Sequence, residues 1–516
     1  MNDLLLLSPE IIISVAAFLV LTLDIIWKGD RRSSTILPWV AFGGTVLALL
    51  AVIFIWLAGA FSDQFGVATD ANNAIYMVAV DQMALFFKIF ALLTVALVSL
   101  SAVDYINKYS PFPGEFYSLT LFAGLSLMLL SSATNLVMIY LALEFLSITS
   151  YILTGYLRQD SRSVEAAVKY FLYGALASGV MLYGFSLLYG ATGSVDLATI
   201  ATSLAALRPS SIDLATIGST LASIQAVTLL IVVSVVLVLT GFGFKIALVP
   251  FHQWSPDAYE GAPTPITAFL SVGPKAAGLA VLIRVMIVAL PAYSVNWTVI
   301  LSLIAIITMT LGNLVALWQT NIKRLLAYSS IAQAGYMLIG LAAWTADPPG
   351  NYLSGGVDAI LLFLFAYLFT NLGVFAVAII LENQLGTANI SDYAGLIRRS
   401  PFLSVALLVF FLSLIGIPPT GGFLGKFFVF GAAINQGLYL LAAFGIINSV
   451  ISVYYYFGIA RLVFFSEGPD ESPIQASVVM NAVVTVTLVM TLLIALYGQP
   501  FIQLATDSAN ILAAAF

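Results

Sequence analysis

The 516-residue sequence has no cysteine, a single histidine and very little charge. The lack of cysteine excludes disulfides and cysteine-ligated iron–sulfur clusters from this chain, and one histidine excludes a haem with two histidine ligands. Charged residues make up 8% of the sequence, against about 25% in an average soluble domain. The net charge of −6, without a basic cluster, argues against a nucleic-acid partner.

Hydrophobic residues dominate instead, at 61% of the sequence. Apolar runs of about 20 residues recur along nearly the whole chain, and each is long enough to cross a bilayer as a helix. A backbone inside lipid must satisfy its own hydrogen bonds, which favours helices. The composition therefore predicts an all-α polytopic membrane protein.

We predict about fourteen membrane spans. They start near Pro9, Thr35, Gln82, Phe116, Leu136, Arg162, Gln225, Thr264, Val295, Asn321, Val357, Phe402, Leu438 and Val478. Alternate loops should then differ in Lys and Arg content, because loops on the cytoplasmic side are enriched in both.

The loop charges follow this rule, with eleven basic residues on one side and one on the other. The eleven are Lys28, Arg31, Arg32, Lys108, Arg158, Arg162, Lys323, Arg324, Arg398, Arg399 and Arg461. The single residue opposite is Arg208. This asymmetry predicts that both termini lie on the non-cytoplasmic side.

Six basic residues remain inside the predicted spans. Lys88 and Arg284 lie near span ends, where snorkelling to the interface would explain them. The other four lie deeper and are Lys169, Lys245, Lys275 and Lys426. Among the acidic residues, only Glu144 lies near the centre of a span.

These five deep charges cannot face lipid. Each would cost about 2.5–3.5 kcal/mol at the bilayer centre, or roughly 12–17 kcal/mol together. That exceeds the whole stability of a typical domain. We expect them to face the interior, paired or hydrated. A purely structural ion pair between Glu144 and one lysine is an alternative, but one carboxylate cannot neutralise four ammonium groups.

Two predicted spans, the seventh and the twelfth, carry helix breakers beside a lysine. Residues 241–263 read GFGFKIALVPFHQWSPDAYEGAP, and residues 413–430 read SLIGIPPTGGFLGKFFVF. They are five spans apart in the count, an odd number, so they run in opposite directions. Interrupted segments of opposite sense are typical of inverted-repeat transporters. We predict N-terminal helices over 1–115, two five-helix repeats over 116–290 and 291–465, and a last helix over 466–516.

Two polar stripes occur on predicted helix faces. They are Ser329, Gln333 and Tyr336 in the tenth span and Asn448, Ser452 and Tyr455 in the thirteenth. Such stripes form either hydrogen bonds between helices or a hydrated path. Because both stripes lie near the lysine series, we retain the hydrated path as one of the two interpretations.

A buried lysine can release its proton near neutral pH, because burial disfavours the ammonium form, whereas a nearby carboxylate favours it. A Glu144–lysine pair that opens and closes would therefore move a proton on and off the lysine. His252, with an ordinary pKa of about 6.5, is a candidate relay at the first break. A hydrogen-bonded structural role is the alternative for this histidine.

The motifs FKIALVPFHQWSPDAYEGAPTPITAFLS, IKRLLAYSSIAQAGYMLIG, SDYAGL and LIGIPPTGGFLGKF carry a family resemblance. The sequence resembles the antiporter-like subunit N, or subunit 2, of respiratory complex I. The likeness is strongest to the version found in the cyanobacterial and plastid type-1 NAD(P)H–quinone oxidoreductase. It extends over nearly the whole chain and is most distinct from the fourth to the thirteenth span.

The resemblance implies fourteen helices and two inverted repeats with one half-channel each. By position it assigns a first charged pair to Glu144 and Lys169, a central lysine to Lys245, an axial link to His252 and Lys275, and an exit-side lysine to Lys426. It implies that no cofactor is bound by this chain and that iron–sulfur clusters and quinone belong to other subunits.

The resemblance also implies partners and a location. The partners are sister antiporter-like subunits and small membrane subunits of the same complex. The location is a cyanobacterial or plastid thylakoid membrane, or a bacterial inner membrane.

The favoured function is that of a non-redox, proton-translocating subunit of an NAD(P)H or ferredoxin–(plasto)quinone oxidoreductase. A stand-alone cation/proton antiporter is the main alternative. Such antiporters usually hold metal ions with intramembrane carboxylates, and this chain has one near a span centre, Glu144. A structural scaffold is a second alternative, but it leaves the deep lysines without a role.

The charge asymmetry gives a first testable prediction. A topology reporter fused after Phe516 is expected to show that the C-terminus lies on the non-cytoplasmic side of the membrane. A fusion that reports the cytoplasm would show that one span has been miscounted.

Overall fold

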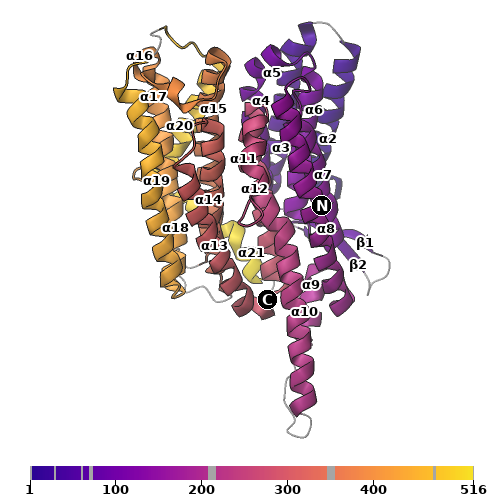
Figure 1. Ribbon diagram of the computed structural model, residues 1–516. Helices are drawn as coiled ribbons and strands as arrows, with labels where there is room; N and C mark the ends of the chain where they lie inside the picture. Colours follow the sequence, from indigo (N-terminus) through magenta and orange to yellow (C-terminus); the bar gives the residue numbers. More distant parts are fainter. Residues whose placement is uncertain are drawn as a thin grey trace.

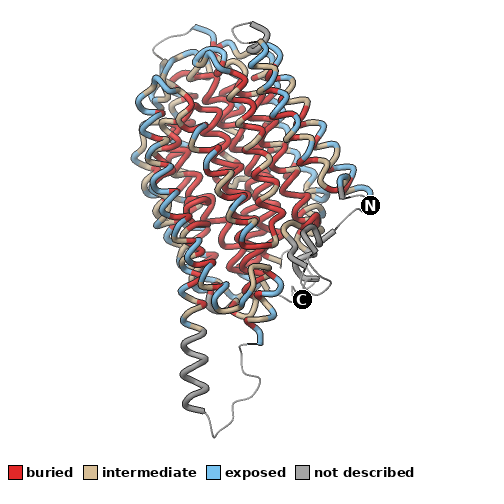
Figure 2. The backbone as a smooth tube through the Cα atoms, turned by 90° about the vertical axis from the view of Figure 1, so that its right-hand side faces the viewer, coloured by how far each residue is buried: buried red, intermediate tan, exposed pale blue. Residues whose placement is uncertain are grey.

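The computed structural model describes residues 3–27, 31–59, 62–68, 74–206, 217–345, 355–468 and 472–514. Long helices stand side by side in one upright bundle (Figure 1). Buried residues fill its interior and exposed ones cover its outside (Figure 2). Lys28, Arg208 and Phe516, which enter the topology prediction, lie outside the described residues.

The N-terminal part consists of helices and one β-hairpin. Its elements are α1 (Asp3–Leu6), α2 (Ser8–Ile26), α3 (Arg31–Leu57), β1 (Ser62–Ala68), β2 (Ala74–Val80), α4 (Gln82–Ser101) and α5 (Val103–Tyr109). The two strands pair antiparallel. Asp81 caps α4, since its carboxylate accepts a hydrogen bond from the Ala84 amide at 2.6 Å.

The next part contains the first broken span. Its elements are α6 (Pro113–Ser132), α7 (Leu136–Thr154), α8 (Ser161–Thr192), α9 (Leu197–Ala206), α10 (Ile217–Ile246), α11 (Trp254–Gly261), α12 (Thr264–Arg284) and the π-helix η1 (Val285–Ala289). Asn135 and Asp160 cap α7 and α8 through their side chains. The N-terminal part of α10 extends beyond the lower end of the bundle (Figure 1).

The remaining elements complete the bundle. They are η2 (Pro291–Tyr293), α13 (Ser294–Ala316), α14 (Ile322–Ala342), α15 (Val357–Leu385), η3 (Ile390–Tyr393), α16 (Leu396–Arg399), α17 (Pro401–Ile415), α18 (Gly421–Asn435), α19 (Tyr439–Phe465), α20 (Val478–Leu496) and α21 (Gln499–Ala514). Helix α15 is central, because every residue from Val357 to Leu381 is buried.

The predicted all-α polytopic fold is confirmed. In the described part of the chain, 13 helices are long and apolar enough to cross a membrane. Helices α17 and α18 have 15 residues each and together form an interrupted span, which completes the predicted fourteen. Helix α5, with Lys108, and α16, with Arg398 and Arg399, lie at the same upper end of the bundle (Figure 1).

The two predicted breaks share a backbone pattern. After α10, Ala247 adopts a left-handed conformation with φ 64°, and the Leu248 amide donates to the Gly243 carbonyl at 2.7 Å. After α17, Gly416 has φ 93°, and the Ile417 amide donates to the Leu412 carbonyl at 2.9 Å. In both, the residue after the left-handed one bonds to the carbonyl five positions earlier, which ends the helix cleanly.

Two charges expected to snorkel are instead buried in ion pairs. Lys88 Nζ lies 2.7 Å from Glu10 Oε1, with side-chain exposures of 1% and 9%. Arg284 forms two hydrogen bonds to the Asp81 carboxylate, at 2.6 and 2.7 Å. The prediction of snorkelling was wrong, because distance from a span end does not reveal the helix face or a partner on another helix.

The Lys88–Glu10 pair generates a second prediction. Glu10→Gln leaves a buried ammonium without a counter-charge, which should destabilise the fold by about 3–5 kcal/mol. Replacing both residues, with Glu10→Gln and Lys88→Met, should recover most of this loss because no charge then remains buried. Thermal unfolding of the detergent-purified protein, followed by tryptophan fluorescence, would measure both effects. Equal destabilisation by the single and double variants would contradict the prediction.

Candidate functional site, a series of buried lysines

Lys245 lies in the last turn of α10, immediately before the first break, and is fully buried. Its Nζ donates a hydrogen bond to Ser147 Oγ on α7 at 3.1 Å and lies 5.8 Å from the centre of the Tyr170 ring. Glu144, one turn before Ser147, is close enough to act electrostatically on Lys245. The two form no ion pair within 4.0 Å, and Glu144 Oε1 is buried without a hydrogen-bond partner in the described part of the chain.

The expected pair between Glu144 and Lys169 is not formed. The Lys169 side chain is 42% exposed and pairs with Glu165 at 2.8 Å and with Asp257 at 2.9 Å. Helix α8 has 32 residues, more than a bilayer requires, so Lys169, in its third turn, lies near the end of the helix rather than at depth. The sequence assignment of Lys169 to the deep set was therefore wrong.

Lys275 is buried at the middle of α12. Its Nζ donates to Ser330 Oγ on α14 at 2.6 Å and lies 5.9 Å from the Tyr259 ring centre. Ser330 Oγ also accepts a hydrogen bond from the Tyr367 hydroxyl on α15 at 2.8 Å. Lys275 thus contacts α11 of the first predicted repeat and α14 of the second.

Lys426 is buried in α18, beside the second break. Its Nζ donates to the carbonyls of Leu414 and Ile415 at 2.9 and 3.0 Å, and to Ser449 Oγ at 3.2 Å. The Tyr336 ring centre lies 4.1 Å away. The break leaves the last carbonyls of α17 without helical partners, and the negative end of the helix dipole favours a cation there.

The polar stripe of α14 lies between Lys275 and Lys426. Gln333 Nε2 donates to the Leu414 carbonyl at 2.9 Å, the same carbonyl that accepts from Lys426. Ser329, next to the Lys275 partner Ser330, is hydrogen-bonded to the Tyr456 hydroxyl. Polar side chains of α14 thus contact Lys275 directly, through Ser330, and share the Leu414 carbonyl with Lys426, through Gln333.

The rest of the predicted stripes meet at a residue that the sequence analysis missed, Asn313 of α13. Its Nδ2 donates to the Tyr336 hydroxyl at 3.0 Å and to Asn448 Oδ1 at 3.3 Å, while its Oδ1 accepts from the Tyr455 hydroxyl at 3.0 Å. An asparagine inside the apolar run TLGNLVA was the available signal. Ser452, by contrast, bonds back to its own helix at the Ser449 carbonyl, 2.6 Å away.

His252 lies half-buried in the segment after the first break. Its Nδ1 is buried and has no hydrogen-bond partner among the described residues. Its backbone carbonyl accepts from the Ser255 amide at 2.9 Å. No direct hydrogen bond between the side chains of His252 and Lys275 is seen in the described structure, where the Lys275 ammonium bonds to Ser330. A relay role for His252 stays a prediction.

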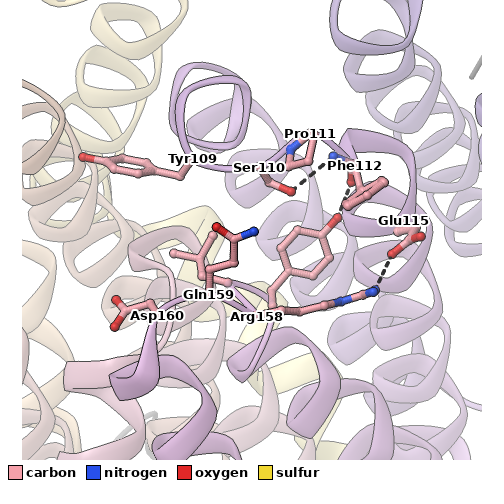
Figure 3. Close-up of a pocket in the computed structure, with 10 residues that line it drawn as sticks. Tyr109, Ser110, Pro111, Phe112, Glu115, Arg158, Gln159 and Asp160 are labelled. Carbon is pink, nitrogen blue, oxygen red and sulfur yellow. Dashed lines mark hydrogen bonds and ion pairs between the residues drawn. The ribbon is translucent and has the colours of Figure 1, made fainter. Parts of the chain in front are cut away.

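An opening near the start of α6 is separate from these lysines. It has a volume of about 680 Å³ and lies between the start of α6 and the α7–α8 connection (Figure 3). Arg158 pairs with Glu115 at 2.8 Å on its wall, and the Tyr156 hydroxyl bonds to the Phe112 carbonyl. None of the buried lysines lines it.

Chemically, the three deep lysines share one kind of environment. Lys245, Lys275 and Lys426 bond to hydroxyl or carbonyl oxygens and, among the described residues, have no carboxylate within ion-pair distance. Such acceptors can stabilise an ammonium without fixing it, and a hydroxyl can also donate to the neutral amine. The described residues contain no group of three or more His, Cys, Asp or Glu that could hold a metal ion.

Comparison with known proteins places the chain. Residues 133–452 match the family described as NADH:quinone oxidoreductase/Mrp antiporter, transmembrane. The chain is 42% identical to NADH-quinone oxidoreductase subunit N 2 of Symbiobacterium thermophilum, over 98% of this chain and 96% of the relative. It is 40% identical to NAD(P)H-quinone oxidoreductase subunit 2 of Gloeobacter violaceus, over 97% and 92%.

A solved structure has the same fold over nearly the whole chain. A chain of respiratory complex I from Thermus thermophilus with bound aureothin aligns with a TM-score of 0.74 and 32% identity, covering 96% of this chain and 98% of that one. The matched region includes both broken spans and the lysines beside them, since residues 245 and 426 fall within the family match. The chain therefore belongs to the NADH:quinone oxidoreductase/Mrp antiporter transmembrane family, together with the subunit N and subunit 2 proteins.

Proposed function

We propose that this chain is a proton-translocating membrane subunit of an NAD(P)H or ferredoxin–(plasto)quinone oxidoreductase. The observation that carries the proposal is the set of three buried lysines without a carboxylate partner in the described structure, two of them beside polar side chains of α14. Burying an unpaired charge is expensive, and a structural role would favour a closed ion pair such as Lys88–Glu10. Groups that must change protonation state need an environment that tolerates both forms.

In this proposal the proton is held at lysine Nζ atoms and moves along the bundle. Glu144 biases Lys245 from a distance and stabilises its ammonium form when the two approach. We propose that the path from Lys275 to Lys426 follows the polar side chains of α14, from Ser330, which bonds to Lys275, to Gln333, which shares the Leu414 carbonyl with Lys426. His252 is proposed as a relay because its buried Nδ1 is unpartnered in the described structure.

The division into repeats is part of the proposal. The equivalent backbone patterns at Ala247 and Gly416 support two related units over 116–290 and 291–465, flanked by 1–115 and 466–516. A lysine lies beside each break, before the first and after the second. This supports one half-channel in each unit.

The same proposal covers cofactors, partners and location. We propose that this subunit carries out no redox step, and that iron–sulfur clusters and quinone belong to other subunits of the complex. The partners are its other membrane-arm subunits, and the location is a thylakoid membrane or a bacterial inner membrane with both termini on the lumenal or periplasmic side. The relatives include NAD(P)H-quinone oxidoreductase subunit 2 of the cyanobacterium Gloeobacter violaceus, which is consistent with either membrane.

The deciding experiment separates a proton carrier from a fixed charge. Arginine keeps the charge of lysine but is effectively never deprotonated in proteins. Lys245→Arg and Lys426→Arg should therefore assemble and yet pump nearly as poorly as the alanine variants. Proton flux in vesicles that contain the complex would measure this, at matched electron-transfer rates. Wild-type flux in both arginine variants would refute the carrier role, and flux coupled to Na⁺ would favour a cation/proton antiporter.

Glu144 gives a separate prediction. Glu144→Gln keeps the size of the side chain but removes the charge that acts on Lys245. We expect impaired pumping with largely normal assembly, because in the described structure no ion pair within 4.0 Å holds Glu144 in place. Pumping per assembled complex, from flux and a membrane-complex gel, is the measurement. Poor assembly with normal pumping in the remaining complexes would indicate a structural role instead.

A further inference from the structure

Six charged side chains gather around a cavity of about 210 Å³ that the proposed pathway does not use. This ion cluster consists of Arg162, Glu165 and Lys169 of α8, Asp257 and Glu260 of α11, and Arg324 of α14. Positive and negative groups are equal in number. Five of the six are joined by ion pairs, whereas Arg162 pairs with Asp160. Three helices from both proposed repeats therefore meet in one partly exposed cluster.

Asp257 is the link between the two sides of this cluster. Its Oδ2 accepts from Lys169 Nζ on α8 at 2.9 Å, and its Oδ1 accepts from Arg324 Nη1 on α14 at 2.8 Å. The same Arg324 nitrogen also bonds to Glu260 Oε2 on α11 at 2.9 Å. One carboxylate thus ties the short helix α11 to the first repeat through one oxygen and to the second repeat through the other.

Helix α11 in turn contacts the backbone that carries Lys245. Trp254, one turn before Asp257, donates its Nε1 to the Phe244 carbonyl at 2.8 Å, and Phe244 directly precedes Lys245. The Trp254 ring also stacks on Tyr170, with ring centres 4.2 Å apart and planes 10° from parallel. Tyr170 follows Lys169 in α8 and lies under the Lys245 ammonium.

The energetics favour a positioning role over a stabilising one. The side chains of Lys169, Asp257 and Arg324 are 31–42% exposed, so each pair contributes little to stability, typically below about 1 kcal/mol. Helix α11 has only eight residues, too few to hold its own place or conformation. Its orientation depends on what it touches at each end, and the cluster supplies one of those contacts.

We propose that Asp257 is a positioning residue that fixes α11 between the two repeats and so sets Lys245 for proton transfer. A shift of α14 relative to α8 then reaches Lys245 through Asp257, α11 and Trp254. This inference rests on the proposed proton-carrying role of Lys245 but assigns the coupling to residues outside the lysine series.

The test compares Asp257→Asn with a matched control, Glu165→Gln. Both variants remove one carboxylate from Lys169, but only Asp257 also reaches α14. We expect Asp257→Asn to lose protons pumped per electron transferred, measured per assembled complex in vesicles, and Glu165→Gln to keep the wild-type ratio. Asp257→Glu, which keeps a carboxylate, should restore part of the ratio.

Several results would overturn this inference. A wild-type ratio in Asp257→Asn, or an equal loss in Glu165→Gln, would show that the link between repeats has no role. Reduced assembly with a normal ratio in the complexes that form would show a structural role only. Lys245→Arg in the same assay separates the two proposals: if it pumps normally the proton-carrier role fails, and if it alone is inactive only the Asp257 role fails.

Discussion

The cost of placing charge in a low-dielectric interior decides how this bundle is built. Several ammonium and guanidinium groups are buried in it, and each must exchange water for protein ligands. Two of them, Lys88 and Arg284, do so by closing ion pairs with Glu10 and Asp81. These pairs join α2 to α4 and the start of α4 to the end of α12. Because each buried charge needs a partner on another helix, the pairs also hold the N-terminal helices to the rest of the bundle.

Three other buried cations, Lys245, Lys275 and Lys426, are stabilised by neutral hydrogen-bond acceptors instead of carboxylates. Their partners are serine hydroxyls and, at the second break, main-chain carbonyls that an intact helix would have used itself. An ion pair holds a lysine in its charged form, whereas a neutral acceptor lets burial weaken that form. The contrast within one interior separates charges that hold helices together from the three lysines to which the proposed function assigns proton exchange.

The sequence predicted the parts of this arrangement that depend on local chemistry. The spans follow from apolar run length, and both breaks follow from Pro, Gly and a neighbouring lysine. It could not predict what depends on contacts between distant helices. Lys169 was predicted to lie deep because nothing in the sequence of a 32-residue helix marks the edge of the bilayer. Asn313 joins side chains of three helices, and such contacts appear only in the folded bundle. The partner of Arg284 is 203 positions away, beyond any local pattern.

The two helix breaks relate proton exchange to movement between helices. A continuous helix would consume its carbonyls and would hold each span as one rigid rod. Interrupting α17 frees two carbonyls that bind Lys426, and interrupting the seventh span leaves α11 as a separate eight-residue unit. That unit carries a contact to the Lys245 backbone at Trp254 and a contact to both α8 and α14 at Asp257. The lysines proposed to exchange protons and the proposed link between the two repeats thus arise from the same departure from regular helix.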